Sequence, residues 1–372
     1  MLAESAVVER VAAAARNAAP WAGVGPSPEV AGMRRLPGGV SSLTYAAEIR
    51  AGGADGYPVV IKIAPPGLDP VRNRDVLRQS RLMAAIGATG ALPVPRILVD
   101  DDGDPPLFVM DLAPGQSYEP LLDVAENPPA ASVVRERALV AAASLAGLQG
   151  LDPVLAGSGE PVLDLRTELD RWERLLQTVP DEIVPGHAEL YRRLAAAVPT
   201  DAAPVLVHGD YRQANMLFEG SVLNAVIDWE IWSVGDPRLD LAWLLMHTAP
   251  AHRYARTRSA VDQDAGAGMP SREELVSAYL ESGGPARPDD LPWFLAYSYY
   301  KVASTLGVIV KRSRKDAEPP EHLLAAADSL PDVVAYGLEA LSGRRPAGVA
   351  SRHWRSPHPG GSRQEPEADR GP

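Results

Sequence analysis

The sequence predicts an α+β protein, with a small, mostly antiparallel sheet in its N-terminal part and a larger, mostly helical C-terminal part. Residues 45–49 and 58–63 are apolar, flank an AGGADG turn and predict two paired strands. Another strand is predicted to begin within 92–97, and a further one lies in the LFVM segment from Leu107. From Ala131 onwards, apolar residues recur every three or four positions, which predicts helices.

The other elements follow in chain order. Residues 2–19 are rich in alanine and predict a helix that ends before Pro20 and a Pro/Gly linker. A helix is expected over 72–86, and the tyrosine-rich residues 291–310 predict a long helix late in the chain. We therefore divide the chain into an N-terminal lobe, a C-terminal lobe and a tail, over 1–112, 113–342 and 343–372. The Pro, Gly, Arg and His composition of the tail predicts disorder.

Composition and charge exclude several classes of function. Of the 372 residues, 46% are hydrophobic, and no apolar run is long enough to span a bilayer. The alanine-rich N-terminus lacks the basic and then apolar pattern of a secretory signal. The absence of cysteine excludes disulfides, thiolate catalysis and cysteine metal sites. A net charge of -12 argues against a nucleic-acid surface, so we expect a cytoplasmic protein without nucleic-acid or membrane partners.

The stretch from Val205 to Leu241 carries the strongest signal of chemistry. Asp210 follows His208 by two positions, Asn215 follows Asp210 by five, and Asp228 comes after a short predicted hairpin. Because residues 205–207 predict a short buried strand, the polar group from His208 to Asp210 lies where a strand gives way to a loop. This position is rigid and open to water.

The hairpin is expected to bring two oxygen-bearing side chains together. Residues 216–218 and 222–227 predict its strands, with Asn215 at the entrance and Asp228 at the exit. Mg²⁺ prefers hard oxygen ligands and keeps several waters, whereas zinc would want more nitrogen or sulfur. The spacing therefore predicts a magnesium site.

The motifs HGDYR, IDWE and GDPRLDLA follow one another in this order. This pattern resembles the aminoglycoside phosphotransferase and choline kinase-like superfamily. It is especially similar to kinase domains that are found alone in bacteria or fused ahead of acyl-CoA dehydrogenase domains. The resemblance covers roughly 34–341 and implies a bilobal protein kinase-like fold. It also implies an enzyme that uses ATP and Mg²⁺ to phosphorylate a hydroxyl of a small-molecule acceptor.

The resemblance also implies residue roles. Asp210 would be the base that orients the substrate hydroxyl, with His208 supporting the loop, while Asn215 and Asp228 would hold Mg²⁺. Arg212 would meet the transferred phosphate or an acidic acceptor, with a solvent salt bridge as the alternative.

Two further acidic residues of this stretch have structural interpretations. Asp236 with Pro237 predicts the N-cap and first position of a helix. Asp240 is interpreted as a brace for the loop rather than a substrate contact.

On the nucleotide side, Lys62 in VVIKIAPPG is interpreted as the lysine that contacts the α- and β-phosphates. The alternative is a snorkelling edge lysine. The LPGGVSSLTY segment would form a tight hairpin over the phosphates, or an ordinary hairpin turn, and its candidate residues are Gly38, Gly39, Ser41 and Ser42.

Phe108 would lie behind the adenine, with the backbone of Met110 to Leu112 reading the adenine edge. Kinases pair the strand lysine with a glutamate on the next helix, but this chain has Gln79 there. We expect either that Asp75 substitutes or that Gln79 holds Lys62 by a neutral hydrogen bond of about 0.5 to 1.5 kcal/mol.

The sequence leaves the acceptor open. One set of residues is acidic and could line a pocket for a polycationic aminoglycoside, or form a solvated surface: Asp262, Asp264, Glu273, Glu274, Glu281, Asp289 and Asp290. A second set is basic and would suit an anionic acceptor such as a phosphate-bearing acyl thioester: Lys301, Lys311, Arg312, Arg314 and Lys315.

Several functions therefore compete. The preferred hypothesis is a kinase of a hydroxylated metabolite such as a hydroxyacyl thioester, and an antibiotic O-phosphotransferase is the alternative. A non-catalytic nucleotide-binding pseudokinase is a hypothesis of another class, and a metal-dependent hydrolase is a distant third. A protein kinase is disfavoured, because Gly209 replaces the arginine that binds an activation-loop phosphate and the chain from Asp228 to Asp240 is too short for an activation segment.

Overall fold

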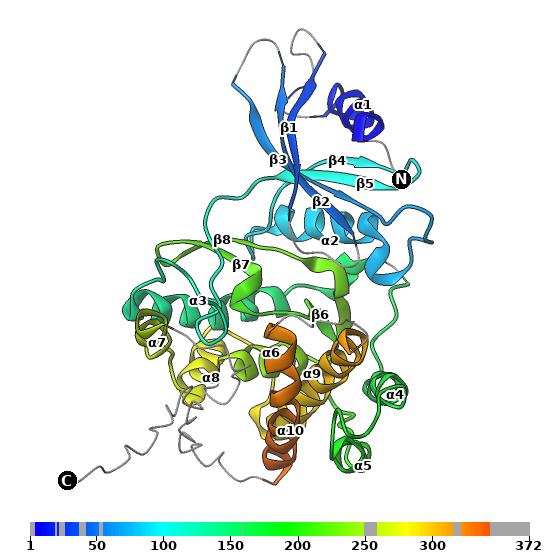
Figure 1. The fold of residues 1–372 in the computed structure, drawn as a ribbon. Coiled ribbons are helices and arrows are strands. Elements are labelled where there is room, and N and C mark those ends of the chain that lie inside the picture. The colour runs from blue at the N-terminus through cyan, green and yellow to red at the C-terminus, as the bar shows by residue number, and fades with distance from the viewer. Residues whose placement is uncertain are drawn as a thin grey trace, which may run out of the picture.

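The computed structural model describes residues 4–18, 21, 27–36, 42–51, 55–157, 159–248, 259–314 and 321–342. In this part of the chain, a sheet with two helices forms one body and a larger set of helices forms the other, one above the other in Figure 1. The predicted α+β class is confirmed. The predicted tail lies outside the described residues.

The N-terminal body is built on a five-stranded sheet of order β1-β2-β3-β5-β4, in which all neighbours are antiparallel. The strand pair predicted across the AGGADG turn is β2 and β3, and β3 pairs in turn with β5 so that Lys62 lies opposite Phe108. The strands are β1 (Glu29–Arg35), β2 (Leu43–Arg50), β3 (Tyr57–Ile63), β4 (Ile97–Asp101) and β5 (Leu107–Asp111).

One helix covers each face of this sheet. Helix α1 (Glu4–Ala15) packs on the face that carries Ile61 and Ile63. Helix α2 (Val76–Thr89) packs on the other face, which carries Phe108. Because side chains alternate along a strand, Lys62 lies on the α2 face.

Both helices are shorter than predicted. The first was predicted over 2–19 but ends at Ala15. The second was predicted from Arg72, but α2 begins at Val76 because the Asp75 carboxylate accepts the Arg78 N–H at 2.9 Å and caps it. The residues before this cap form the short 3₁₀ helix η1 (Arg72–Arg74).

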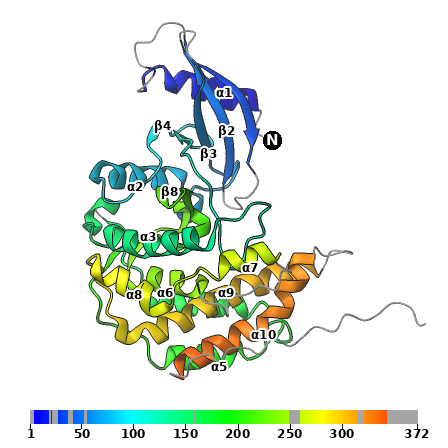
Figure 2. The ribbon, with the colours of Figure 1, turned by 90° about the vertical axis from the view of Figure 1, so that its left-hand side faces the viewer.

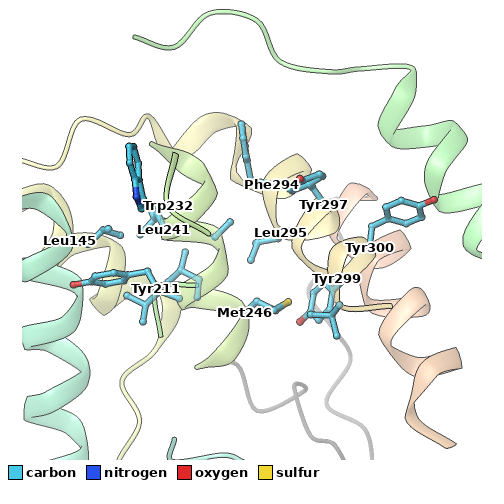
Figure 3. Close-up of a cluster of buried hydrophobic side chains, with 14 of the residues drawn as sticks. Leu145, Tyr211, Trp232, Leu241, Met246, Phe294, Leu295, Tyr297, Tyr299 and Tyr300 are labelled. Carbon is cyan, nitrogen blue, oxygen red and sulfur yellow. The ribbon is translucent and has the colours of Figure 1, made fainter. Parts of the chain in front are cut away.

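The C-terminal body is built around the long helix α9, which packs against α6 and α10 (Figure 2). Its tyrosines Tyr297, Tyr299 and Tyr300 are buried with Met246 and Phe294 in the core drawn in Figure 3. The helices are α3 (Ala131–Gln149), α4 (Leu165–Leu176), α5 (His187–Ala195), α6 (Arg238–His247), α7 (Ala260–Gly266), α8 (Arg272–Glu281), α9 (Leu291–Ser313) and α10 (Glu321–Leu341). Among the described residues, no helix combines the length and the apolar character needed to cross a membrane.

Two small antiparallel pairs lie between the sheet and the helices (Figure 1). Strand β6 (Val205–Val207) pairs with β9 (Ser233–Gly235), and β7 (Met216–Glu219) pairs with β8 (Val222–Val226). The short buried strand and the hairpin predicted from the sequence are therefore present.

The chain leaving β5 runs directly onto this hairpin. Gln116 exchanges two backbone hydrogen bonds with Phe218. Gly115 beside it has a φ of 109°, and a Cβ there would lie 2.8 Å from the Phe218 backbone, so the close approach requires glycine. The connection between the two bodies is thus fixed to the β7–β8 hairpin.

Candidate active site

The catalytic loop, defined as residues 208–215, is held by its backbone. The Asp240 carboxylate on α6 accepts the N–H groups of His208 at 2.6 Å and of Gly209 at 2.9 Å. The Lys301 ammonium on α9 donates to the Gly209 carbonyl at 2.7 Å, and the Tyr211 hydroxyl donates to Ala141 O on α3 at 2.9 Å. Three helices thus fix the loop, and the predicted bracing role of Asp240 is confirmed.

His208 is fully buried and links the loop to the end of the hairpin. Its Nε2 lies 2.9 Å from Ile227 O, and its Nδ1 accepts the Asp210 N–H at 3.2 Å. These two partners fit a neutral imidazole with its proton on Nε2. The ring packs 4.5 Å from Trp229 between centroids. His208 therefore shapes the loop, as predicted, and does not face the reacting groups.

Gly209 is required by a second contact between the loop and the chain after the hairpin. It has a φ of 86°, and a Cβ at this position would lie 2.6 Å from Ile231 O. A side chain here would meet both the left-handed backbone penalty and a backbone clash. The sequence had linked this glycine only to the exclusion of a protein kinase.

Three polar side chains contact the Asp210 carboxylate. Its Oδ1 accepts the Trp243 Nε1–H at 2.7 Å and its Oδ2 accepts the Asn215 amide at 2.8 Å. The Arg212 guanidinium lies 3.2 Å away. Burial alone would raise the pKa of Asp210, but the Arg212 and Lys301 charges outweigh it and hold that pKa below its usual value. Asp210 is therefore an ionised and tightly oriented carboxylate.

Trp243 and Lys301 form one unit beside Asp210. The Lys301 ammonium lies 4.1 Å from the centroid of the Trp243 ring, a cation–π contact. Burial lowers the pKa of Lys301, although Asp210 and Asp240 oppose that effect. The sequence did not predict the part of Trp243, which directly follows the GDPRLDLA segment but does not belong to it.

Glu119 is a second carboxylic acid behind the loop. It is only 1% exposed, and its Oε2 accepts the Ala214 N–H at 3.1 Å and lies 3.8 Å from Arg212. Burial raises the pKa of Glu119 from 4.5 to about 7, against the opposing charge of Arg212. Arg212 thus lies between two carboxylates, Asp210 and Glu119. The solvent salt bridge, which was the alternative interpretation of Arg212, is wrong, because its ion pairs with Asp210 and Glu119 are internal.

Asn215 and Asp228 lie at the same end of the β7–β8 hairpin. The Ile227 N–H donates to Asn215 O at 2.9 Å, which places residue 228 next to the loop. Asp228 adopts a left-handed backbone, with a φ of 65°, and its side chain is 43% exposed. Carboxylate and amide oxygens are the donors that Mg²⁺ prefers, and two protein ligands leave room for water and phosphate oxygens. The residues fit the predicted ion.

No group of three or more His, Cys, Asp or Glu side chains suited to a metal occurs within the described ranges. A site made of Asn215 and Asp228 does not need such a group, because one of its two donors is an amide.

Lys62 is bound to the same end of the hairpin. Its side chain is 8% exposed, and its Nζ lies 3.0 Å from Asp228 Oδ1 and 4.0 Å from Glu230 Oε2. It is therefore not a snorkelling edge lysine. Lys62 joins the sheet to the residues that follow the hairpin.

The predicted partners of Lys62 are wrong. The Gln79 amide donates to Asn73 O at 3.3 Å, and its Oε1 is buried without a hydrogen-bond partner. The Asp75 carboxylate is used to cap α2 and lies 3.8 Å from Arg81. The sequence could not show that Gln79 bonds to η1 and that Asp75 caps α2.

The profile of the Phosphotransferase enzyme family matches residues 32–275, more than half of the chain, and includes the catalytic loop. The chain belongs to this family. This membership supports a phosphotransferase enzyme.

Human acyl-CoA dehydrogenase family member 11 is similar to this phosphotransferase at 27% identity over 291 residues. The matched part is 75% of this chain but only 37% of that relative, so the chain spans little more than a third of its length.

Two solved structures share the fold. A provisionally named aminoglycoside phosphotransferase from Ralstonia eutropha has a TM-score of 0.69 at 21% identity, over 90% of this chain and 98% of that one. A thermostable mutant of aminoglycoside phosphotransferase APH(4)-Ia, in a ternary complex with AMP-PNP and hygromycin B, has a TM-score of 0.51 at 16% identity. The match covers 83% of this chain and 95% of that one. At these identities the comparison establishes the fold alone, and the predicted kinase-like fold is confirmed.

The nucleotide side of this phosphotransferase is described in part. Gly38, Gly39 and Ser41 lie outside the described residues. Ser42 is 3% exposed, and its hydroxyl has no hydrogen-bond partner within the described part of the chain.

In the segment predicted to bind the adenine edge, two backbone N–H groups already form hydrogen bonds within the protein. Phe108 is fully buried against the α2 side of the sheet. The N–H groups of Asp111 and Leu112 donate to Arg96 O and Pro58 O, so they are not available to an adenine edge. The prediction is corrected for these two amides, because the sheet extends further than the sequence suggested.

The acidic set near the C-terminus does not gather at Asp210. Asp262 is fully buried and accepts the Tyr118 hydroxyl at 3.0 Å. Glu274 caps α8 and pairs with Arg135, and Asp290 pairs with Arg238. These carboxylates serve the fold.

The basic set is also dispersed. Of its described members, Lys301 reaches the catalytic loop, whereas Lys311 donates to Thr178 O and Arg314 pairs with Glu182. Lys315 lies outside the described residues.

One structural expectation from this stretch needs a small correction. Helix α6 begins at Arg238, one residue later than predicted, with Pro237 at the N-cap position. Asp236 instead accepts the Arg238 N–H at 2.9 Å and pairs with its guanidinium. Its predicted structural role is nevertheless correct.

Proposed function

We propose that this phosphotransferase transfers the γ-phosphate of ATP to a hydroxyl group of a small molecule, with Mg²⁺ as the cofactor. One observation carries the proposal. Asp210, Asn215 and Asp228 lie around one end of the β7–β8 hairpin, and Lys62 reaches the same end from the sheet. A base, two oxygen ligands and a phosphate-binding cation are the parts that phosphoryl transfer needs.

Asp210 would accept the proton of the acceptor hydroxyl. The hydroxyl oxygen attacks the γ-phosphorus, the bond between the β-phosphate oxygen and the γ-phosphorus breaks, and ADP leaves. Asp210 is ionised at neutral pH because its pKa lies below its usual value, and it is held in one orientation by Trp243 and Asn215. Its main contribution is therefore to orient the hydroxyl.

Asn215 and Asp228 would hold the metal, and Lys62 would align the phosphates. When bound, Mg²⁺ neutralises charge on the phosphate oxygens. Lys62 supplies a fixed positive charge from a buried strand position. Arg212, 28% exposed and beside Asp210, would meet the transferred phosphate.

For the acceptor, we propose a hydroxylated metabolite such as a hydroxyacyl thioester. The similarity to an acyl-CoA dehydrogenase family member supports this class. Three of the acidic residues that would hold a polycation, Asp262, Glu274 and Asp290, are used elsewhere in the fold. The cations Arg212 and Lys301 lie near Asp210. An antibiotic acceptor is the second candidate, because the structural neighbours include a phosphotransferase crystallised with hygromycin B.

A pseudokinase is disfavoured by the same geometry. Its main motivation was Gln79, but Lys62 finds carboxylate partners in Asp228 and Glu230. The base and both candidate metal ligands are present.

The proposal is tested by incubating the purified protein with ATP and Mg²⁺ and a pool of hydroxyl compounds. The pool contains hydroxyacyl-CoA thioesters, sugars, choline, macrolides and aminoglycosides, and products are detected by mass. The expected result is a phosphate adduct of a hydroxyacyl thioester that is lost when Mg²⁺ is chelated. An adduct on an antibiotic alone would support the second candidate. Phosphate release without any adduct would contradict both and favour a hydrolase.

A further inference from the structure

The residues after the β7–β8 hairpin contact both bodies of the protein. We name residues 228–232 the 228–232 turn. Asp228 and Glu230 approach Lys62 on β3, while Trp229 packs on His208 of the catalytic loop. At its end, Trp232 O accepts a hydrogen bond from Arg78 of α2 at 3.1 Å.

The Asp228 carboxylate would have to bind both Lys62 and Mg²⁺. In this structure its Oδ1 lies 3.0 Å from Lys62 Nζ. Under the proposed function the same carboxylate holds Mg²⁺, and a divalent cation and a lysine repel each other at short range. Lys62, at 8% side-chain exposure, then needs another carboxylate to offset the cost of burying its charge.

Glu230 is placed to be that carboxylate. Its Oε2 lies 4.0 Å from Lys62 Nζ, and its side chain is 22% exposed, about half the exposure of Asp228. It lies on the one-turn helix η4 (Trp229–Ile231), two residues after Asp228. One turn of chain therefore carries both the candidate metal ligand and a second partner for Lys62.

Helix α2 is held without the lysine. Arg78 forms a two-pronged ion pair with Glu160, and its guanidinium carbon lies 3.5 Å from the centroid of the Trp232 ring. Gln79, the next residue, is 1% exposed and bonds only to Asn73 O among the described residues. Helix α2 therefore contacts the end of the 228–232 turn through Arg78, whereas Lys62 contacts its beginning through Asp228 and Glu230.

From this geometry we propose that Glu230 is the positioning residue for Lys62 when Asp228 is occupied by the metal. The inference rests on the proposed function, because it concerns the same nucleotide site. Glu230 supplies the carboxylate for Lys62 that kinases place on the next helix, where this chain has Gln79. Lys62 is then aligned by the same turn that presents Asp228, and needs no ion pair with a residue of α2.

The test measures ATP affinity by calorimetry on the full chain, once with MgCl₂ and once with EDTA. The variants are Glu230→Gln and Glu230→Asp. Glu219→Gln is the matched control, since it removes the same charge from the far end of the hairpin, where Glu219 bonds to Asn224. No acceptor is needed. Thermal unfolding of each variant shows whether it is folded.

The proposal predicts a difference that depends on magnesium. With MgCl₂, Glu230→Gln weakens ATP binding about tenfold, the change expected for an interaction of about 1.4 kcal/mol. With EDTA, Asp228 still serves Lys62, and the change is less than about twofold. Glu230→Asp keeps the charge, so it loses less than Glu230→Gln, and Glu219→Gln resembles the wild type in both conditions.

Equal effects of Glu230→Gln with and without magnesium, or no effect in either, would overturn the proposal. If Glu230→Gln does not fold, Glu230→Asp decides. A magnesium-dependent weakening then supports the proposal, and wild-type affinity in both conditions overturns it. A wild-type protein that binds no ATP at all would instead contradict the proposed function, so the two failures are distinguishable.

Discussion

The Asp210 side and the Lys62 side of the site are built differently. Asp210 and the loop around it are fixed by α3, α6 and α9, through Tyr211, Asp240 and Lys301. Lys62 comes from a strand of the other body and, among the described residues, pairs with two carboxylates, both on the 228–232 turn. The site therefore has one rigid half, which includes the base, and one half whose alignment depends on a single turn of chain.

The difference shows why this turn matters. Its residue Ile231 also contacts Gly209, so a change in the turn is transmitted to the catalytic loop. Variants of the catalytic loop, of the side chains that contact it and of the cap of α2 can therefore separate the contributions of the two halves.

Gly209→Ala should have the largest effect. The new Cβ would lie 2.6 Å from Ile231 O at a left-handed φ, so the loop and the 228–232 turn must move apart. A displacement of about 1 Å can lower the rate about 100-fold, and we expect at least that loss of phosphoryl transfer. Gly220→Ala is the control, because it has a φ of 58° and no atom within 4 Å of its Cβ. It should lose about 1 kcal/mol of stability and keep its activity. Equal activity of the two variants would show that the contact is unimportant.

Glu119→Gln should change how stability depends on pH. The pKa of Glu119 is raised from 4.5 in the unfolded chain to about 7 by burial, so the native state binds the proton more tightly. The wild type therefore loses stability as pH rises from 4.5 through 7, by on the order of 3 kcal/mol. Glu119→Gln lacks this loss, so its stability relative to the wild type should rise between pH 5 and pH 8. Urea unfolding at each pH measures it, and a constant difference would contradict the raised pKa.

Trp243→Phe should reduce turnover by about tenfold, since it removes one hydrogen bond to an ionised carboxylate. The affinity for ATP should be unchanged, because the indole touches Asp210 and not the Lys62 side. Trp293→Phe is the control, as its indole bonds to Leu194 O at 3.0 Å, on the other side of α9. A rise in the KM for ATP with unchanged kcat would contradict this role and show that Trp243 acts in nucleotide binding.

The sequence predicted that Asp210, Asn215 and Asp228 lie close together but did not predict the partners of Lys62, for a physical reason. Asp210, Asn215 and Asp228 lie within one short stretch whose strands and turn fix their relative positions, so spacing alone places them. Lys62 takes its partners from a distant part of the chain, and the spacing from Asp75 or Gln79 says nothing about them.

Residues that reach the loop from elsewhere were also missed. Trp243 and Glu119 come from α6 and from the segment after β5, and neither carries a motif. Their contacts with the loop arise from the packing of the whole C-terminal body. The order of the strands and helices was predictable, because the spacing at which apolar residues recur differs between strands and helices. The exact ends of helices were not, since capping by Asp75 decided one of them.

Asp75→Asn should have the smallest effect. Asparagine caps a helix about as well as aspartate, and Asp75 does not contact Lys62 in this structure. ATP affinity should therefore change less than about twofold, as measured by calorimetry. Asp75→Ala, which removes the cap, should cost about 1 kcal/mol of stability. A clear loss of ATP affinity in Asp75→Asn would restore Asp75 as a partner of Lys62.

The central claim is that Asp210 is the base of a magnesium-dependent kinase site. A single-turnover measurement tests it, with Asp210→Asn and the wild type in excess over ATP and an acceptor found in the pooled assay. The account predicts that Asp210→Asn binds ATP and Mg²⁺ within about twofold of the wild type but transfers phosphate at least about 100-fold more slowly. Full transfer by Asp210→Asn would contradict it.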